Sequence, residues 1–100
     1  MKKLEWHPEV FGPVALASAP NLEGWRLPTR AELIALFDSG DFPESMRDKC
    51  FWSSTSYAPY PAGAWVVYFG NGGTNADYPT YTFYVRLVRS GQSFSSLGAA

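Results

Sequence analysis

The chain contains few of the residues from which catalytic and metal sites are usually built. Its 100 residues include a single cysteine, Cys50, and a single histidine, His7. One cysteine excludes an intrachain disulfide, and no Cys/His spacing typical of a zinc site is present. We expect Cys50, beside Phe51 and Trp52, to be a small buried apolar side chain. Because His7 has no nearby serine or cysteine in sequence, we predict no catalytic role, no metal and no cofactor.

The chain also has no large excess of positive or negative charge and no long apolar run. Lys and Arg number 8 and Asp and Glu number 9, for a net charge of -1, and the basic residues are scattered. A nucleic-acid surface needs a basic patch, and a membrane-spanning helix needs roughly 20 apolar residues. No apolar run follows Lys2 and Lys3, as it would in a signal peptide. We therefore expect no nucleic-acid or membrane partner. We expect a cytoplasmic protein if the chain is complete, and an extracellular one if it is a fragment of a secreted protein.

Aromatic residues, in contrast, are abundant at 17% of the chain. Their large side chains fill a core efficiently. A chain of this length buries about 60–70% of its unfolded surface, enough for one core. We expect a single compact domain over residues 1–90, followed by a flexible C-terminal tail over residues 91–100.

One short helix is predicted over residues 29–38. Thr29 and Glu32 have the spacing of a capping box, in which each side chain accepts a hydrogen bond from the other's backbone amide. Three apolar residues then recur at the spacing of one helical face: Leu33, Leu36 and Phe37. The helix should end near Gly40, because glycine readily adopts the left-handed conformation that follows many helices.

Alternating apolar residues predict strands in the second half of the chain. Within residues 64–69, one face is formed by Trp65, Val67 and Phe69. Within residues 81–89, Phe83, Val85 and Leu87 share one face, and Tyr84, Arg86 and Val88 share the other. We expect these two runs to be antiparallel neighbours joined by a loop over residues 70–80. Shorter strands are expected at residues 51–53 and, as an edge strand interrupted by Pro8, at residues 4–10.

Three segments in this order resemble a known family: Gly24–Thr29, Phe51–Thr55 and Tyr84–Arg89. With the strand at residues 64–69 and its Asn-Gly turn, they are similar to DUF1566, also called the C-terminal domain of the Legionella collagen-like adhesin. The resemblance covers about residues 24–89. It implies an α+β fold related to C-type-lectin-like and formylglycine-generating-enzyme domains, with a twisted antiparallel sheet, one short helix and long loops. Family members are thought to bind glycans, proteins or surfaces.

The chain departs from the family pattern upstream of residue 24. Members carry a longer helix with an aromatic residue and a cysteine there, whereas this chain has only residues 11–20. We expect no more than a turn or two of helix after Pro13, and thus a minimal version of the fold.

Two loops are the first candidate for a binding surface. Residues 56–63 and 70–80 are rich in Tyr, Pro, Gly and Asn, a composition that suits exposed contact surfaces. The candidate binding residues are Tyr57, Tyr60, Asn75, Asp77 and Tyr78. Loops on either side of one strand normally emerge at opposite ends, so these two meet only if residues 70–80 fold back. The alternative interface is an acidic segment after the helix: Asp38, Asp41, Glu44 and Asp48.

Other polar residues are given structural roles. Ser53, Ser54 and Thr55 lack the context of a nucleophile and are expected to bond backbone groups at a strand end. Arg26 and Arg86, inside core motifs, are expected to bond loop carbonyls or a carboxylate such as Glu32, with a ligand carboxylate as the alternative.

A calcium site is disfavoured. Calcium takes six to eight oxygen ligands, including several carboxylates. The loop over residues 70–80 offers Asn71, Asn75 and only one carboxylate, Asp77.

These observations predict a non-catalytic binding module that engages a protein partner through its surface loops. Two alternatives remain open: an inhibitor of a host protein complex, encoded by a phage or mobile element, and a glycan-binding adhesin-type domain. An enzyme of the formylglycine-generating group is disfavoured, because the chain has one cysteine and no second reactive residue beside it.

Overall fold

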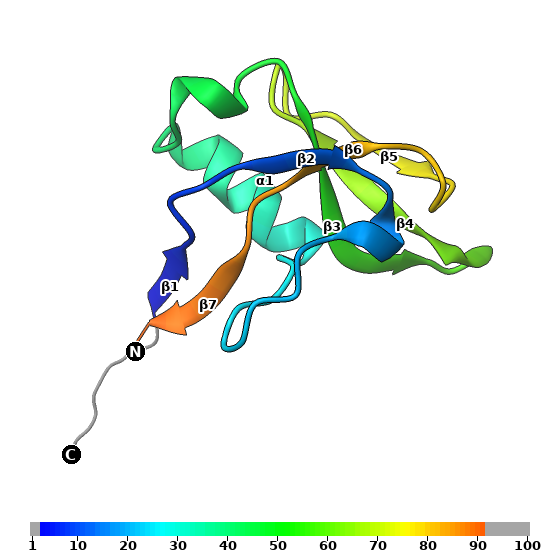
Figure 1. The fold of residues 1–100 in the computed structure, drawn as a ribbon. Helices are drawn as coiled ribbons and strands as arrows, with labels where there is room; N and C mark the ends of the chain where they lie inside the picture. The colour runs from blue at the N-terminus through cyan, green and yellow to red at the C-terminus, as the bar shows by residue number, and fades with distance from the viewer. Residues whose placement is uncertain (1–2, 92–100) are drawn as a thin grey trace.

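A computed structural model describes residues 3–91, in which one helix packs on a five-stranded sheet and a two-stranded ribbon extends beside them (Figure 1). The strands are β1 (Lys3–Trp6), β2 (Phe11–Val14), β3 (Cys50–Tyr57), β4 (Tyr60–Tyr68), β5 (Thr74–Asp77), β6 (Phe83–Val85) and β7 (Val88–Gly91). The helices are α1 (Arg30–Ser39) and two single 3-10 turns, η1 (Leu16–Ser18) and η2 (Glu44–Met46). The small α+β class predicted from the sequence is confirmed. Of the tail expected at residues 91–100, Gly91 ends β7 and the rest lies outside the described residues.

Helix α1 forms where the capping box predicts it. The Thr29 hydroxyl accepts a hydrogen bond from the Glu32 amide at 3.1 Å, and the Glu32 carboxylate accepts one from the Thr29 amide at 2.9 Å. The helix ends at Gly40, which has a left-handed φ of 71°. No helix within residues 3–91 is long and apolar enough to cross a membrane.

The predicted pairing of residues 64–69 with residues 81–89 is wrong. The order of the five-stranded sheet is β2-β6-β3-β4-β5, so β3 lies between β4 and β6. β3 is central because its residues are buried on both faces: Phe51 and Trp52 are both fully buried. A period-two pattern shows which residues share a face but not which strand lies next to which. The sheet is also mixed, since β3 and β6 run parallel while the other pairs are antiparallel.

The two terminal strand predictions also need correction. Residues 81–89 are divided between β6, in the large sheet, and β7, which leaves that sheet to pair with β1. The edge strand expected over residues 4–10 is shorter and ends at Trp6, before Pro8 removes a backbone donor. The predicted faces are nevertheless right, because Phe83, Val85 and Leu87 pack in one cluster.

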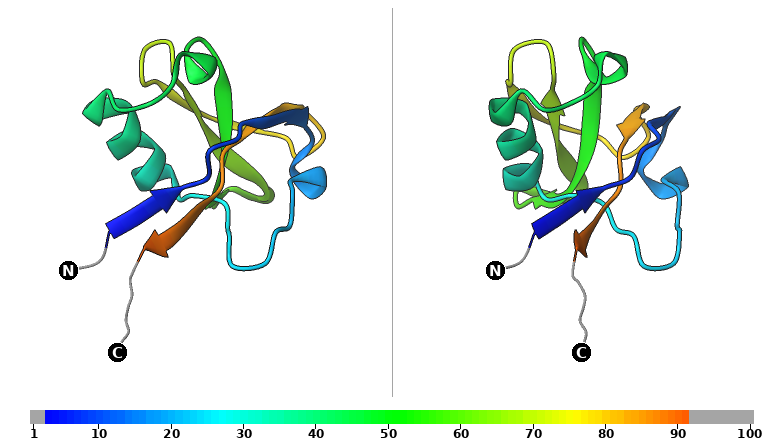
Figure 2. Two further views of the ribbon diagram at one scale, coloured as in Figure 1. Left: turned by 60° about the vertical axis from the view of Figure 1, so that its left-hand side comes forward. Right: turned by 90° about the vertical axis from the view of Figure 1, so that its left-hand side faces the viewer.

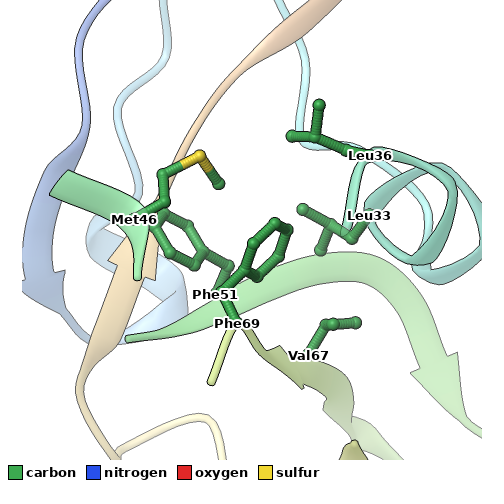
Figure 3. Close-up of a cluster of buried hydrophobic side chains, with 6 residues drawn as sticks. All are labelled: Leu33, Leu36, Met46, Phe51, Val67 and Phe69. Carbon is green, nitrogen blue, oxygen red and sulfur yellow. The ribbon is translucent and has the colours of Figure 1, made fainter. Parts of the chain in front are cut away.

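The sheet separates two apolar clusters. Between α1 and the sheet lie Leu33, Leu36, Met46, Phe51, Val67 and Phe69 (Figure 3). On the opposite face lie Trp52, Ala64, Val66, Val85 and Leu87, covered by the irregular segment that contains η1 (Figure 2). This single turn is the whole of the upstream helix, as the sequence predicted. Trp52 is fixed there by its indole N–H, which donates to the Val14 carbonyl at 2.9 Å.

Candidate binding surface

Four of the five predicted binding residues line one hollow at an end of the sheet. The hollow has a volume of about 350 Å³ and is lined by Tyr57, Tyr60, Ala76, Asp77 and Tyr78. The sequence placed these residues in two separate loops, with no means of showing that they meet.

Strand pairing explains why they meet. Residues 56–63 form the tip of the β3–β4 hairpin, with Tyr57 opposite Tyr60. Residues 70–80 contain a strand, β5, that runs back along β4 with Ala64 opposite Asp77. The end of β5 therefore returns to the start of β4, where the hairpin tip lies. The two segments were predicted as loops, but residues 56–63 contain the ends of β3 and β4 on either side of a turn at 58–59, and residues 70–80 contain β5.

The exposed aromatic rings form a continuous group. The ring centroids of Tyr60 and Tyr78 are 5.5 Å apart, and those of Tyr78 and Tyr81 are 5.8 Å apart, both edge to face. The three residues are 46%, 56% and 51% exposed. We call Tyr57, Tyr60, Tyr78 and Tyr81 the tyrosine surface. Tyr81, three positions after Tyr78 in the sequence, extends this surface beyond the hollow.

Tyr57 connects this surface to the helix. Its ring packs edge to face on Trp65 at 5.3 Å, and the Arg30 guanidinium lies 4.3 Å from the centre of the Trp65 ring. Arg30 is the first residue of α1, and its amide donates to the Thr55 hydroxyl at 2.9 Å. The start of the helix therefore fixes the position of Tyr57, which is less exposed than the other three.

The fifth predicted residue, Asn75, lies in an adjoining hollow of about 230 Å³, whose lining also includes Cys50, Tyr68, Asn71 and Asp77. Asp77 therefore belongs to both hollows. Burial raises the pKa of the Asp77 carboxyl. Burial, and then the charge of Asp77, raise the pKa of the Cys50 thiol. Cys50 was expected to be buried, but its side chain is only partly buried.

The acidic residues of the alternative interface are all exposed but do not line a common hollow. Glu44 pairs with Arg47 at 3.0 Å, and Asp48 occupies a turn with a φ of 65°. Asp41 lines a separate groove beside α1. These four residues are therefore dispersed surface charges and do not form one acidic patch around a hollow.

The contacts with backbone groups predicted for the hydroxyls and arginines are present, but the strand predicted at residues 51–53 extends over Cys50–Tyr57, so Ser53 and Thr55 lie within β3 and not at a strand end. The Ser53 hydroxyl donates to the Trp65 carbonyl at 2.7 Å, and its oxygen accepts from the Thr55 amide at 3.1 Å. Arg26 makes two hydrogen bonds of 2.8 Å with the Glu32 carboxylate. Its side chain is 45% exposed, however, so it lies at the surface and not in the core. Arg86 donates to the His7 carbonyl at 2.8 Å.

The His7 side chain also has local contacts. Its Nδ1 accepts from the Glu9 amide at 3.1 Å, and its ring packs 4.7 Å from the Trp25 ring. Within residues 3–91, no group of three or more His, Cys, Asp or Glu side chains could hold a metal ion.

Comparison with known proteins agrees with the resemblance indicated by the three sequence motifs. The family model of the Lcl C-terminal domain matches residues 4–89, most of the chain. The chain belongs to the Lcl C-terminal domain family. No curated protein matches it. The match extends over β1 and β2, which lie upstream of the motifs that first indicated the resemblance.

Proposed function

We propose that this Lcl-family chain is a non-catalytic binding module that engages a protein partner through the tyrosine surface. One observation carries the proposal: two separate segments bring Tyr57, Tyr60 and Tyr78 to the same hollow, and the Tyr60 and Tyr78 side chains are exposed there. Tyrosine supplies a large contact area with few rotatable bonds, and exposed aromatic residues are enriched where proteins bind one another. A partner that covers these rings would remove apolar surface from water.

The test is capture of partners from a lysate, followed by mass spectrometry. Replacing Tyr57, Tyr60 and Tyr78 by Ala should abolish capture while the circular dichroism spectrum stays unchanged. The matched control neutralises Asp38, Asp41, Glu44 and Asp48, and it should capture the same partner as the unmodified chain. The reverse result, with capture lost only in the acidic variant, would place the interface on the acidic segment.

A glycan is the second candidate ligand, and the polar side chains beside an aromatic ring in the adjoining hollow favour it. Asn71, Asn75 and Asp77 supply amide and carboxylate groups that can hydrogen-bond sugar hydroxyls, beside the Tyr68 ring. A glycan array probed with the chain, and with an Asn75→Ala variant, distinguishes this ligand from a protein. Specific signals that fall in the variant would favour the glycan.

Two finer statements belong to the same proposal. One is that the partner belongs to a host complex, inhibited by a phage- or mobile-element protein, and the identity of the captured partner tests it. The other is that the fold is a reduced C-type-lectin-like domain, as the motifs imply. Comparing an experimental structure with lectin-like domains tests the second statement.

A further inference from the structure

A third hollow lies on another part of the molecule, between α1 and the β1–β7 ribbon. This groove has a volume of about 630 Å³, and its lining includes Leu4 and Trp6 of β1, Leu36 of α1, and Phe42. Three charged residues also line it: Arg86, Asp41, and Glu32, whose carboxylate is already paired with Arg26. We call it the β1 groove. None of its residues belongs to the tyrosine surface.

Strand β1 forms one wall of the groove and is an edge strand. It pairs with β7 on one side only, in a sheet of two strands. Figures 1 and 2 show that the ribbon stands beside the helix and apart from the larger sheet. An edge strand presents unpaired backbone groups, which another extended segment can bind.

The hydrogen bonds of β7 show which backbone groups of β1 point to the open edge. The amide and carbonyl of Val88 both bond to Arg26, each at 2.9 Å. Val88 is opposite Trp6 in the β1–β7 pair, so the backbones of these two residues make no hydrogen bond to each other. In antiparallel strands, hydrogen-bonded and non-hydrogen-bonded pairs alternate. Leu4 and Ser90, two positions further along, are therefore also a non-hydrogen-bonded pair. The backbone groups of Leu4 and Trp6 therefore point away from β7. These are the same two residues that line the groove.

The guanidinium group of Arg86 is a positively charged group in the lining of the groove. Its Nε donates to the His7 carbonyl at 2.8 Å, and its Nη1 lies 3.4 Å from the Met46 sulfur. Its guanidinium carbon is 5.6 Å from the centre of the Trp6 ring. Among residues 3–91, no hydrogen-bond acceptor faces its Nη2, and no carboxylate lies within ion-pair distance of it. Burial disfavours the charged form of Arg86 and lowers its pKa, while the charge of Asp41 acts in the opposite direction. A carboxylate that accepts hydrogen bonds from the guanidinium would offset the cost of burying this charge.

We propose that the β1 groove is a binding site for an extended, acidic segment of a partner protein, which adds as a strand to β1 and places a carboxylate on Arg86. Backbone pairing to Leu4 and Trp6 would supply affinity that does not depend on sequence, as in other cases of strand addition. Arg86 would select a Glu or Asp side chain, and Leu36 and Phe42 would contact apolar neighbours of that side chain. The β1 groove and the tyrosine surface share no residue, so this proposal is tested independently of the proposed function.

Three capped nine-residue peptides of alternating Thr and Val test the proposal. The first has a central Glu, the second has Gln at that position, and the third keeps Glu but carries an N-methyl group on every backbone amide. Each is titrated into the full chain and followed by NMR. We expect the Leu4 and Trp6 amide signals to shift with the first peptide. We expect the Gln peptide to bind about tenfold more weakly, since a charged hydrogen bond is lost. The N-methylated peptide should not bind.

Three variants separate the two parts of the site. Leu4→Pro removes an amide that faces the open edge, where proline is tolerated, and should abolish binding while the Glu5 amide stays protected from exchange. Leu4→Ala is its matched control, which keeps that amide and should retain binding. Asp41→Asn removes the nearby negative charge and should tighten binding of the Glu peptide severalfold but not that of the Gln peptide.

Two results would overturn the proposal. One is that the Leu4 and Trp6 amides do not respond to any of the peptides, or respond equally to Glu and Gln. The other is that analytical ultracentrifugation shows a dimer in the absence of peptide, with the same amides protected from exchange. That outcome would identify a second copy of the chain as the occupant of the β1 edge.

Discussion

Gly63 and Asp77 lie so close across β4 and β5 that a Cβ atom on Gly63 would sit 2.7 Å from the Asp77 carbonyl oxygen. The same Cβ would lie 3.2 Å from the Tyr60 ring. The missing side chain therefore allows β5 to approach β4 and Tyr60 to lie against them. Gly63 thus supports the tyrosine surface from beneath, without lining its hollow.

Gly63→Ala should destabilise the domain by about 1–3 kcal/mol, the usual cost of overpacking, because the Asp77 backbone cannot move without disturbing the β4–β5 pair. It should also shift the NMR signals of the Tyr60 and Tyr78 rings. Denaturant unfolding measures the first effect. Gly24→Ala is the control: φ is 86° there, but the new Cβ would meet nothing within 4 Å, so the tyrosine signals should not move. Unchanged ring signals in Gly63→Ala would show that the glycine does not position this surface.

Leu36→Ala should lower the free energy of unfolding by about 2–5 kcal/mol, because it leaves a cavity in the cluster between α1 and the sheet. Leu22 is 39% exposed, so Leu22→Ala should cost less than about 0.5 kcal/mol. Thermal and urea unfolding of the two variants provide the comparison. Equal melting curves would contradict the placement of Leu36 in the core.

Arg86→Lys should lower stability by about 1–3 kcal/mol, because an ammonium cannot reproduce the hydrogen bond to His7 and the contact with Met46 at once. Arg47→Lys is the matched control at an exposed ion pair and should change stability by less than about 0.5 kcal/mol. If Arg86→Lys keeps full stability but loses binding of the acidic peptide, the role of Arg86 is confined to the β1 groove.

Acid should weaken the domain partly through Glu32. The hydrogen bonds from Arg26 hold the pKa of the Glu32 carboxyl below its ordinary value, with burial opposing and the Thr29 amide assisting. A group whose pKa is lowered on folding stabilises the folded state above its ordinary pKa, and loses that contribution as the pH falls through the lowered value. Unfolding midpoints of the unmodified chain and Glu32→Gln should therefore converge below about pH 4.5.

Glu44→Gln is the control for that comparison, because the Glu44 side chain is 83% exposed. Its unfolding midpoint should stay close to that of the unmodified chain at every pH. A difference between the unmodified chain and Glu32→Gln that stays constant from pH 6 to pH 3 would show that the Glu32 charge does not contribute.

Cys50 should react slowly with iodoacetamide at pH 8, because burial and the Asp77 charge raise the pKa of its thiol and only the thiolate reacts. Asp77→Asn should speed the reaction, whereas Asp38→Asn, on an exposed part of α1, should leave it unchanged. Mass spectrometry of quenched samples follows the rate. No acceleration in Asp77→Asn would mean that the carboxylate does not influence the thiol.

The sequence by itself determined the local features of this protein. The Thr29–Glu32 box and Gly40 set the limits of α1, because capping depends on residues a few positions apart. Alternation determined that Phe83, Val85 and Leu87 share a face, and the three ordered motifs indicated the family. Tyrosine-rich segments identified Tyr57, Tyr60 and Tyr78 as candidates for a common surface.

Tertiary structure decided what depends on contacts between distant residues. Only the fold shows that β3 separates β4 from β6, since several strands have equally suitable faces. Only the return of β5 along β4 places Asp77 beside the hairpin tip. The open edge of β1 and the fork of Arg86 meet in one groove because β7 leaves the sheet, and a period-two pattern continuous through residues 83–88 gives no sign of that break. Side-chain alternation is a property of one strand, whereas pairing partners are chosen by the packing of the whole domain.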